Sequence, residues 1–298
     1  MNKAGFIGLG IMGKPMAKNL LAAGVELIVN DLDKAAVAEV AEAGACAGTP
    51  REIGASCDVI FTILPNGPIV QSVLFEENGV SADIRRDAVV CDMSSVTPQE
   101  SRFCFQKLAE KGVGFVDAPV SGGEPKAVDG TLAFMAGGEE KDFQRLKPYF
   151  EIMGSSAILV GPSGSGSVTK LANQMIVNLT IAAVSEAFTL AVKAGADPEK
   201  VYEAIRGGLA GSAVLDAKIP MIINRNFKPG GKISINHKDI RNVLASAHAI
   251  DSPAFLSAML FEIMQALKVG GHMDEDHGAI AKFFEQQAGI EITKTGNR

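Results

Sequence analysis

The stretch that decides the fold reads Gly8-Leu9-Gly10-Ile11-Met12-Gly13. It has the G-x-G-x-x-G spacing; a β-rich run, Lys3–Gly8, precedes it and a helix-period segment, Gly13–Ala23, follows it. In that context Gly8 permits a tight turn, Gly10 lets a pyrophosphate approach the backbone, and Gly13 allows close packing of helix on strand. The pyrophosphate would bind free N–H groups at the positive end of the helix. The stretch therefore predicts a dinucleotide-binding turn; the alternative is a glycine-rich turn without a ligand.

An acid closes the next β-rich run. Asp31 follows Glu26–Asn30 and stands 23 positions after Gly8, close to the roughly 20 expected of a carboxylate that accepts hydrogen bonds from an adenosine ribose. Because a 2′-phosphate would meet this negative charge, NAD is favoured as the cofactor, while the nearby Lys34 leaves NADP open. The alternative reading of Asp31 is an ordinary turn acid before the next helix.

The first 160 residues alternate β-rich runs with segments of helical periodicity, which predicts a mostly parallel sheet covered by helices. The further candidate strands are Asp58–Leu64, Ala88–Asp92, Gly114–Ala118, Thr131–Ala136 and Ala157–Gly161. From Val168 to Ala194 neither Gly nor Pro interrupts a helical pattern, and few β-rich runs follow. We predict an α/β fold in which a Rossmann-type parallel-sheet domain, residues 1–163, is joined by a long helix to an all-α domain, residues 164–298.

Composition narrows the class of partner. The net charge of −6 comes from 34 acids and 28 bases, with no long basic run, which argues against a nucleic acid partner. The four cysteines show no CxxC spacing and are interpreted as reduced core residues. No basic leader is visible, and the longest uncharged stretch, Leu171–Ser185, is too short for a bilayer that needs about 20 helical residues. We expect a cytoplasmic protein without a membrane partner.

Four segments occur in an order that resembles one enzyme family, the β-hydroxyacid dehydrogenases, over nearly the whole chain. They are Gly5–Gly13, Asp117–Gly123, Gly166–Gln174 and His237–Asp239. The resemblance implies hydride transfer between NAD(H) and a small semialdehyde or hydroxy acid, and a homo-oligomer, dimeric or tetrameric. Three segments are most similar to the subgroup that reduces tartronate semialdehyde to D-glycerate: Ser121–Ala127, Lys170–Gln174 and Arg206–Ser212.

The resemblance also implies roles for individual residues. Lys170 would be the catalytic acid/base, protonating the carbonyl oxygen in reduction and needing to be neutral before oxidation; taken alone, a lysine there would be a solvated charge. The implied substrate-binding residues are Ser121, Gly122, Gly123, Asn173 and Gln174. The implied cofactor-binding residues are the glycine stretch with Asp31, together with Leu64, Pro65, Asn66, Ser95 and Lys238.

The sequence leaves other readings open. His272–His277 contains histidines and acids of the kinds that ligate metals. Its acids are interpreted as solvating and capping the last helix, so no metal site is predicted. A 3-hydroxyisobutyrate dehydrogenase, or a broad reductase of succinic semialdehyde and glyoxylate, would share the same motifs. A cofactor-binding protein without catalysis is a further alternative, which the intact Lys170 and Asn173 disfavour.

Overall fold

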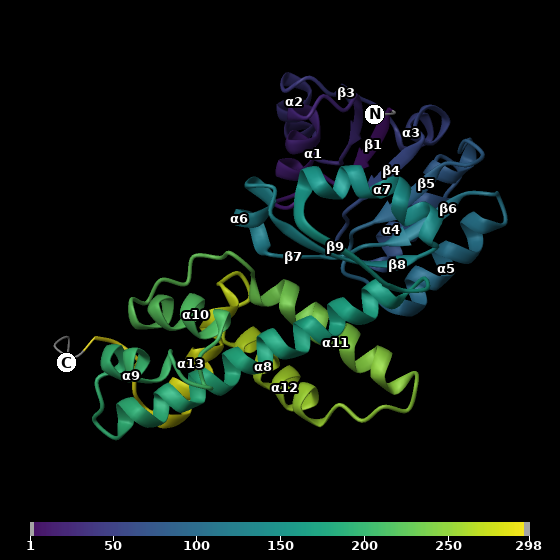
Figure 1. Ribbon diagram of the computed structural model, residues 1–298. Helices are drawn as coiled ribbons and strands as arrows, with labels where there is room; N and C mark the ends of the chain where they lie inside the picture. The colour runs from purple at the N-terminus through teal and green to yellow at the C-terminus, as the bar shows by residue number, and fades with distance from the viewer. Residues whose placement is uncertain (1–2, 295–298) are drawn as a thin grey trace. The chain divides into compact units, whose positions relative to one another are not determined.

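The computed structural model describes residues 3–294, and the chain divides into two compact units between Lys170 and Leu171 (Figure 1). The first contains a sheet with helices and the second is helical, so the predicted fold class is confirmed. The predicted division lies earlier, after Ser163. The two boundaries differ because the start of α8 (Ser165–Lys193) packs on the sheet and so belongs to the first unit. A Cβ on Gly166 would lie 2.3 Å from the Met135 carbonyl oxygen of that sheet.

The sheet of the first unit is parallel along most of its width. Its order is β3 (Cys46–Ala47), β2 (Leu27–Asn30), β1 (Ala4–Ile7), β4 (Val59–Thr62), β5 (Val89–Asp92), β6 (Gly114–Asp117), β8 (Leu132–Gly138) and β7 (Val120–Ser121), and β9 (Gly154–Gly161) pairs with β8. From β3 to β6 all neighbours are parallel, whereas β8 runs antiparallel to β6 and β7 and parallel to β9. The carboxyl ends of the parallel strands therefore share one edge.

Helices cover both faces of this sheet, because successive strand residues point to opposite sides. Phe6 packs into one apolar cluster and its neighbour Ile7 into another. The first cluster lies under α1 (Gly13–Ala22), α2 (Lys34–Glu42), α6 (Gly123–Val128) and α7 (Glu140–Met153). The second lies under α3 (Pro50–Ser56), α4 (Gly67–Phe75), η1 (Val80–Ala82) and α5 (Pro98–Ala109). β4 and β5 are buried throughout, as expected of strands covered on both faces.

The second unit contains the rest of α8 and a set of shorter helices. These are α9 (Pro198–Ile205), α10 (Ala213–Ile223), α11 (Ile233–His248), α12 (Phe255–Val269), η2 (His277–Ile280) and α13 (Ala281–Ala288). The pair Asp197-Pro198 favours a helix start, because Asp can cap a helix and Pro tolerates its first turn. α9 begins there, and the Asp197 carboxylate accepts the Glu199 N–H at 2.9 Å. Ile181 of α8 packs in an apolar cluster with Ile240 of α11 and Met264 of α12.

By length and composition alone, α8 could cross a membrane. The uncharged stretch considered in the sequence is shorter because it stops before Glu186, whereas the helix continues past it. Of its most apolar window, 39% is buried inside the protein. The buried side chains of Gln174, Asn178 and Ser185 are hydrogen-bonded within the fold. These are features of a helix in a protein core, where buried polar groups need partners.

The interpretation of the cysteines is right for three of the four. Cys57, Cys91 and Cys104 are buried and free, and burial raises the pKa of the Cys57 thiol to about 11. Cys46 is exposed, so its interpretation as a core residue is wrong. It lies in β3, a two-residue strand at the edge of the sheet with both residues exposed.

Candidate active site

The glycine turn joins β1 to α1 at the carboxyl edge of the sheet. Gly8 has φ +102°, and a Cβ there would lie 2.2 Å from the Ile63 carbonyl oxygen; a Cβ on Gly13 would lie 1.9 Å from the Gly8 carbonyl oxygen. A Cβ on Gly10 would meet no protein atom of the described residues within 4 Å. The outer two glycines thus serve packing, while Gly10 leaves open space in front of the first-turn N–H groups of α1. Such a surface fits a pyrophosphate.

Asp31 lies directly after β2, beside the glycine turn. Its carboxylate accepts the Leu9 N–H at 2.5 Å and the Asp33 N–H at 2.8 Å. The acid therefore holds the turn in place from the neighbouring strand. Leu32, which follows it, is almost fully exposed, so this corner of the site is open.

A buried acid at the end of β5 supports the next loop. The Asp92 carboxylate accepts the hydroxyls of Thr62, at 2.8 Å, and of Ser94, at 2.5 Å. The Ser94 oxygen in turn accepts the Leu64 N–H at 2.8 Å. Burial raises the pKa of Asp92, and the hydrogen bonds from Ser94 and Thr62 oppose that rise. Asp92 thus fixes the loop after β4 through Ser94.

The remaining predicted cofactor residues of this unit lie on the same edge. Pro65 and Asn66 connect β4 to α4, and the Asn66 side chain caps that helix by accepting the Ile69 N–H at 3.0 Å. Ser95 follows β5 and is half-buried. The structure therefore brings the loops after β1, β2, β4 and β5 to one edge, which is where open parallel sheets bind ligands.

A second buried acid, at the end of β6, anchors the start of α8. The Asp117 carboxylate accepts the Gly164 N–H at 2.7 Å and the Ser167 N–H at 2.8 Å. Burial raises the pKa of Asp117 to about 7, against the lowering effect of these backbone hydrogen bonds. Ser167 also hydrogen-bonds the Ser101 hydroxyl at 2.8 Å. These bonds fix the first turn of the helix that carries Lys170.

Lys170 and the predicted carboxylate-binding segment lie together. The Lys170 Nζ donates a hydrogen bond to the Val120 carbonyl oxygen at 2.8 Å, and Ser121, Gly122 and Gly123 follow directly. Gly122 has φ +140° and Gly123 φ +69°, so the chain turns there through conformations that favour glycine. A half-buried lysine thus contacts the residue that directly precedes Ser121 and the glycines at the start of α6.

In the second unit, Asn173 and Gln174 belong to a network of amides and an acid. Gln174 is buried; its Nε2 donates to Asp239 Oδ2 at 2.7 Å and to Asn236 Oδ1 at 3.1 Å. Its Oε1 accepts from Asn173 Nδ2 at 3.0 Å. The Lys238 ammonium lies 3.1 Å from Asp239 Oδ1. The predicted residues of this unit, Asn173, Gln174 and Lys238, are therefore linked through Asp239.

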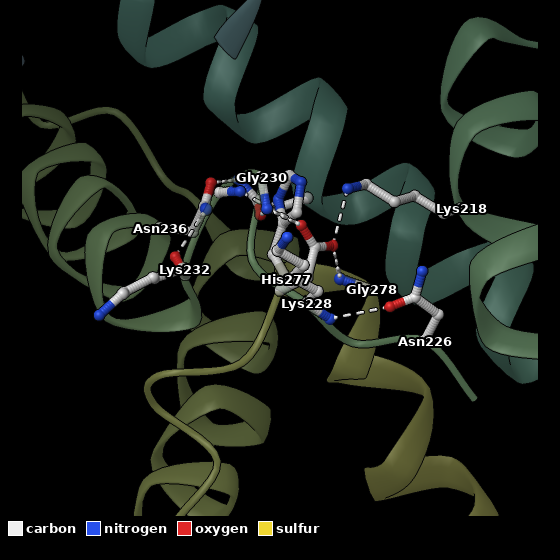
Figure 2. Close-up of polar contacts among 11 residues, drawn as sticks. Lys218, Asn226, Lys228, Gly230, Lys232, Asn236, His277 and Gly278 are labelled. Carbon is white, nitrogen blue, oxygen red and sulfur yellow. Dashed lines mark hydrogen bonds and ion pairs between the residues drawn. The ribbon is translucent and has the colours of Figure 1, made fainter. Parts of the chain in front are cut away.

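The segment His272–His277, which contains residue types that can ligate a metal, supports the fold of the second unit. Asp276 is fully buried, and its carboxylate accepts from the Lys218 ammonium at 2.7 Å and from the N–H groups of Gly230, Gly231 and Gly278 at 2.8 to 3.2 Å. Figure 2 shows Lys218 and Gly278 turned toward the same carboxylate. Asp276 thereby caps η2, while Asp274 is exposed and pairs with Lys232.

Sequence reasoning assigned no supporting role to three buried acids, Asp92, Asp117 and Asp239, whereas it interpreted the acids of His272–His277 as capping the last helix, and Asp276 caps η2 directly before α13. Asp92 and Asp117 each end a buried strand, and an acid at that position is a usable signal, because an unpartnered charge would not be buried. Asp239 carries no comparable local signal.

The fold, the glycine turn and the matching family models define the class of protein. The chain matches the model of the NAD binding domain of 6-phosphogluconate dehydrogenase over residues 3–161. It matches the NAD-binding model of NADP-dependent 3-hydroxyisobutyrate dehydrogenase over residues 164–284. The protein is an NAD(P)-dependent dehydrogenase.

Similar proteins define the family. The chain is 41% identical to 2-hydroxy-3-oxopropionate reductase of Escherichia coli K12, over 97% of this chain and 99% of that protein. It is 37% identical to 2-(hydroxymethyl)glutarate dehydrogenase of Eubacterium barkeri, over 98% and 97%. The structure of 3-hydroxyisobutyrate dehydrogenase of Mycobacterium tuberculosis with L-serine superposes with a TM-score of 0.88 at 30% identity, covering 95% and 98%. The chain belongs to the β-hydroxyacid dehydrogenase family, as its motifs predicted.

Proposed function

We propose that this hydroxyacid dehydrogenase reduces tartronate semialdehyde to D-glycerate with NADH, and that Lys170 is its catalytic acid. The observation that carries the proposal is the Lys170 Nζ at 2.8 Å from the Val120 carbonyl oxygen, directly before Ser121-Gly122-Gly123. The Ser121 hydroxyl and the backbone N–H groups after it are groups that can bind a carboxylate, which supports the proposed role of the neighbouring ammonium. The 41% identity to 2-hydroxy-3-oxopropionate reductase supports the choice of substrate.

The cofactor would be held by the loops at the carboxyl edge of the sheet. The open space at Gly10 fits the pyrophosphate, and the glycine stretch with Asp31, Leu64, Pro65, Asn66 and Ser95 would line its path. Lys238 is a further residue proposed to contact the cofactor. The Asp31 carboxylate favours NAD over NADP, because a 2′-phosphate would meet a negative charge. When bound, the nicotinamide supplies the hydride in reduction and accepts it in oxidation.

The chain's own residues would bind the substrate and move its proton. The Ser121 hydroxyl and the N–H groups of Gly122 and Gly123 would bind the substrate carboxylate. The Lys170 ammonium would hydrogen-bond the carbonyl oxygen and give it a proton as negative charge develops there. In oxidation a neutral Lys170 would remove the proton from the hydroxyl. Asn173, with Gln174 behind it, would orient the substrate.

An assay of NADH and NADPH oxidation with four aldehydes tests this function. Tartronate semialdehyde with NADH should give the highest kcat/KM, above methylmalonate semialdehyde, succinic semialdehyde and glyoxylate. A preference for methylmalonate semialdehyde would favour the 3-hydroxyisobutyrate dehydrogenase alternative. Absence of turnover with all four would favour a cofactor-binding protein without catalysis.

We propose residues 1–163 as the dinucleotide-binding part and residues 164–298 as the part for substrate and oligomerisation, in a cytoplasmic homo-oligomer. Large apolar side chains exposed on the helical unit support self-association: Ile176, Leu190, Phe255, Leu256 and Met259. Analytical ultracentrifugation tests it, and a monomer at all concentrations would contradict it.

A further inference from the structure

The polar network of the second unit fixes which end of the Asn173 amide is free. Asp239 is 2% exposed, and its carboxylate can only accept hydrogen bonds. The Gln174 side chain must therefore turn its NH₂ group toward Asp239 Oδ2, at 2.7 Å, and the same group lies 3.1 Å from Asn236 Oδ1. Two acceptors on one side determine the orientation of the Gln174 amide.

The orientation of the Gln174 amide determines the orientation of the Asn173 amide. With its nitrogen engaged, Gln174 presents Oε1 on the other side, and an amide oxygen can only accept. Asn173 consequently turns its NH₂ group toward Gln174, with Nδ2 at 3.0 Å from Oε1. The carbonyl oxygen of Asn173 is left without a donor among the described residues, on a half-buried side chain.

We propose that Asp239, acting through Gln174, is a positioning residue that makes Asn173 an acceptor for a substrate hydroxyl, so that the enzyme selects semialdehydes with a hydroxyl on the carbon next to the aldehyde. This rests on the proposed function and deepens it. The reacting aldehyde and the carboxylate of such a substrate offer only acceptors, so they cannot satisfy the Asn173 oxygen. A 2-hydroxyl can. The remaining N–H of Asn173 is free to donate back to that hydroxyl.

The expected selectivity is the ratio of kcat/KM between substrates with and without the 2-hydroxyl. A substrate that carries hydrogen or methyl in place of the hydroxyl leaves the Asn173 oxygen without a partner once water is excluded. A neutral hydrogen bond lost in this way reduces kcat/KM about 10-fold. Tartronate semialdehyde and malonate semialdehyde are the matched pair, because they differ only in the 2-hydroxyl.

The test compares kcat/KM for these two aldehydes in the wild type and three variants. Gln174→Met keeps the length and bulk of the side chain but removes the amide; the ratio should fall about 10-fold, with the loss confined to tartronate semialdehyde and NADH affinity unchanged. Asp239→Asn keeps the shape but can present either atom to Gln174, so the ratio should also fall, and this variant carries the test if Gln174→Met does not fold.

Asn178→Leu is the control. Asn178 is buried in the same network and donates to the Gln174 carbonyl oxygen and to Asn236, but it does not set the orientation of the Asn173 amide. The variant should lose stability and keep the ratio. An unchanged ratio in Gln174→Met and Asp239→Asn, or an equal fall in Asn178→Leu, overturns the inference. A wild type that reduces both aldehydes equally well overturns it while leaving the proposed function standing, whereas no reduction of either overturns the proposed function.

Discussion

Gly10 and Gly13 allow cofactor binding and folding to be perturbed separately. Gly10 has no need of a left-handed conformation, and a Cβ there meets open space, so Gly10→Ala should change the free energy of unfolding by less than about 1 kcal/mol. The same methyl would stand between the backbone and the pyrophosphate. Losing one hydrogen bond to a charged group costs about 1.5–3 kcal/mol, so the Kd for NADH should rise about 10- to 150-fold.

Gly13→Ala is the matched control with the opposite pattern. Its Cβ would lie 1.9 Å from the Gly8 carbonyl oxygen and 2.8 Å from Ile63 Cγ2, so α1 must move away from β1. Overpacking of this kind costs about 1–3 kcal/mol. Urea unfolding and NADH fluorescence titration measure the two quantities. The assignment of the turn is refuted if Gly10→Ala binds NADH as tightly as the wild type.

The remaining predictions concern single residues. Lys170→Ala should reduce kcat/KM about 10²- to 10⁴-fold with NADH affinity retained, and wild-type oxidation should speed up toward alkaline pH; a flat profile up to about pH 10 in steady-state assays would remove the proposed role. The pKa of Asp117 is about 7, above its ordinary value near 3.9. The stability that protonated Asp117 contributes is therefore complete below about pH 4 and is lost as pH rises to about 7. Urea unfolding should show the stability of the wild type falling over this window relative to that of Asp117→Asn. Burial alone would raise the pKa of Asp276, but Lys218 and the Gly278 N–H hold it below its ordinary value. The stability that ionised Asp276 contributes is therefore lost as pH falls below about 4. Asp276→Asn should lower the free energy of unfolding by about 3–5 kcal/mol in the same assay, because the Lys218 charge is left without its partner.

Sequence reasoning succeeded where the signal is local. The glycine spacing, the apolar runs of the long strands and the Asp197-Pro198 helix start each lie within a few residues, and each corresponds to an element of the structure. β3 and β7 were not predicted because each contains two residues, too few to show an alternating pattern. The exposure of Cys46 follows from the same short strand.

The site was predictable only in part because its supports are distant in sequence. Thr62 and Asp92 are 30 residues apart, Asp117 and Gly164 are 47 apart, and Gln174 and Asp239 are 65 apart. No periodicity connects such pairs. The motif around Lys170 indicated a catalytic lysine by resemblance, but the acid that fixes its helix became visible only when the chain was folded.

The convergence of four donors on Asp276 has a consequence for how the helical unit opens. The carboxylate closes one span of 58 residues to Lys218 and another of 46 to Gly230, so none of these segments gains its bond until the others are nearby. Local fraying would leave several buried donors unsatisfied at once. Amide protons of Gly230, Gly231 and Gly278 should therefore exchange with solvent together, at the rate of cooperative unfolding.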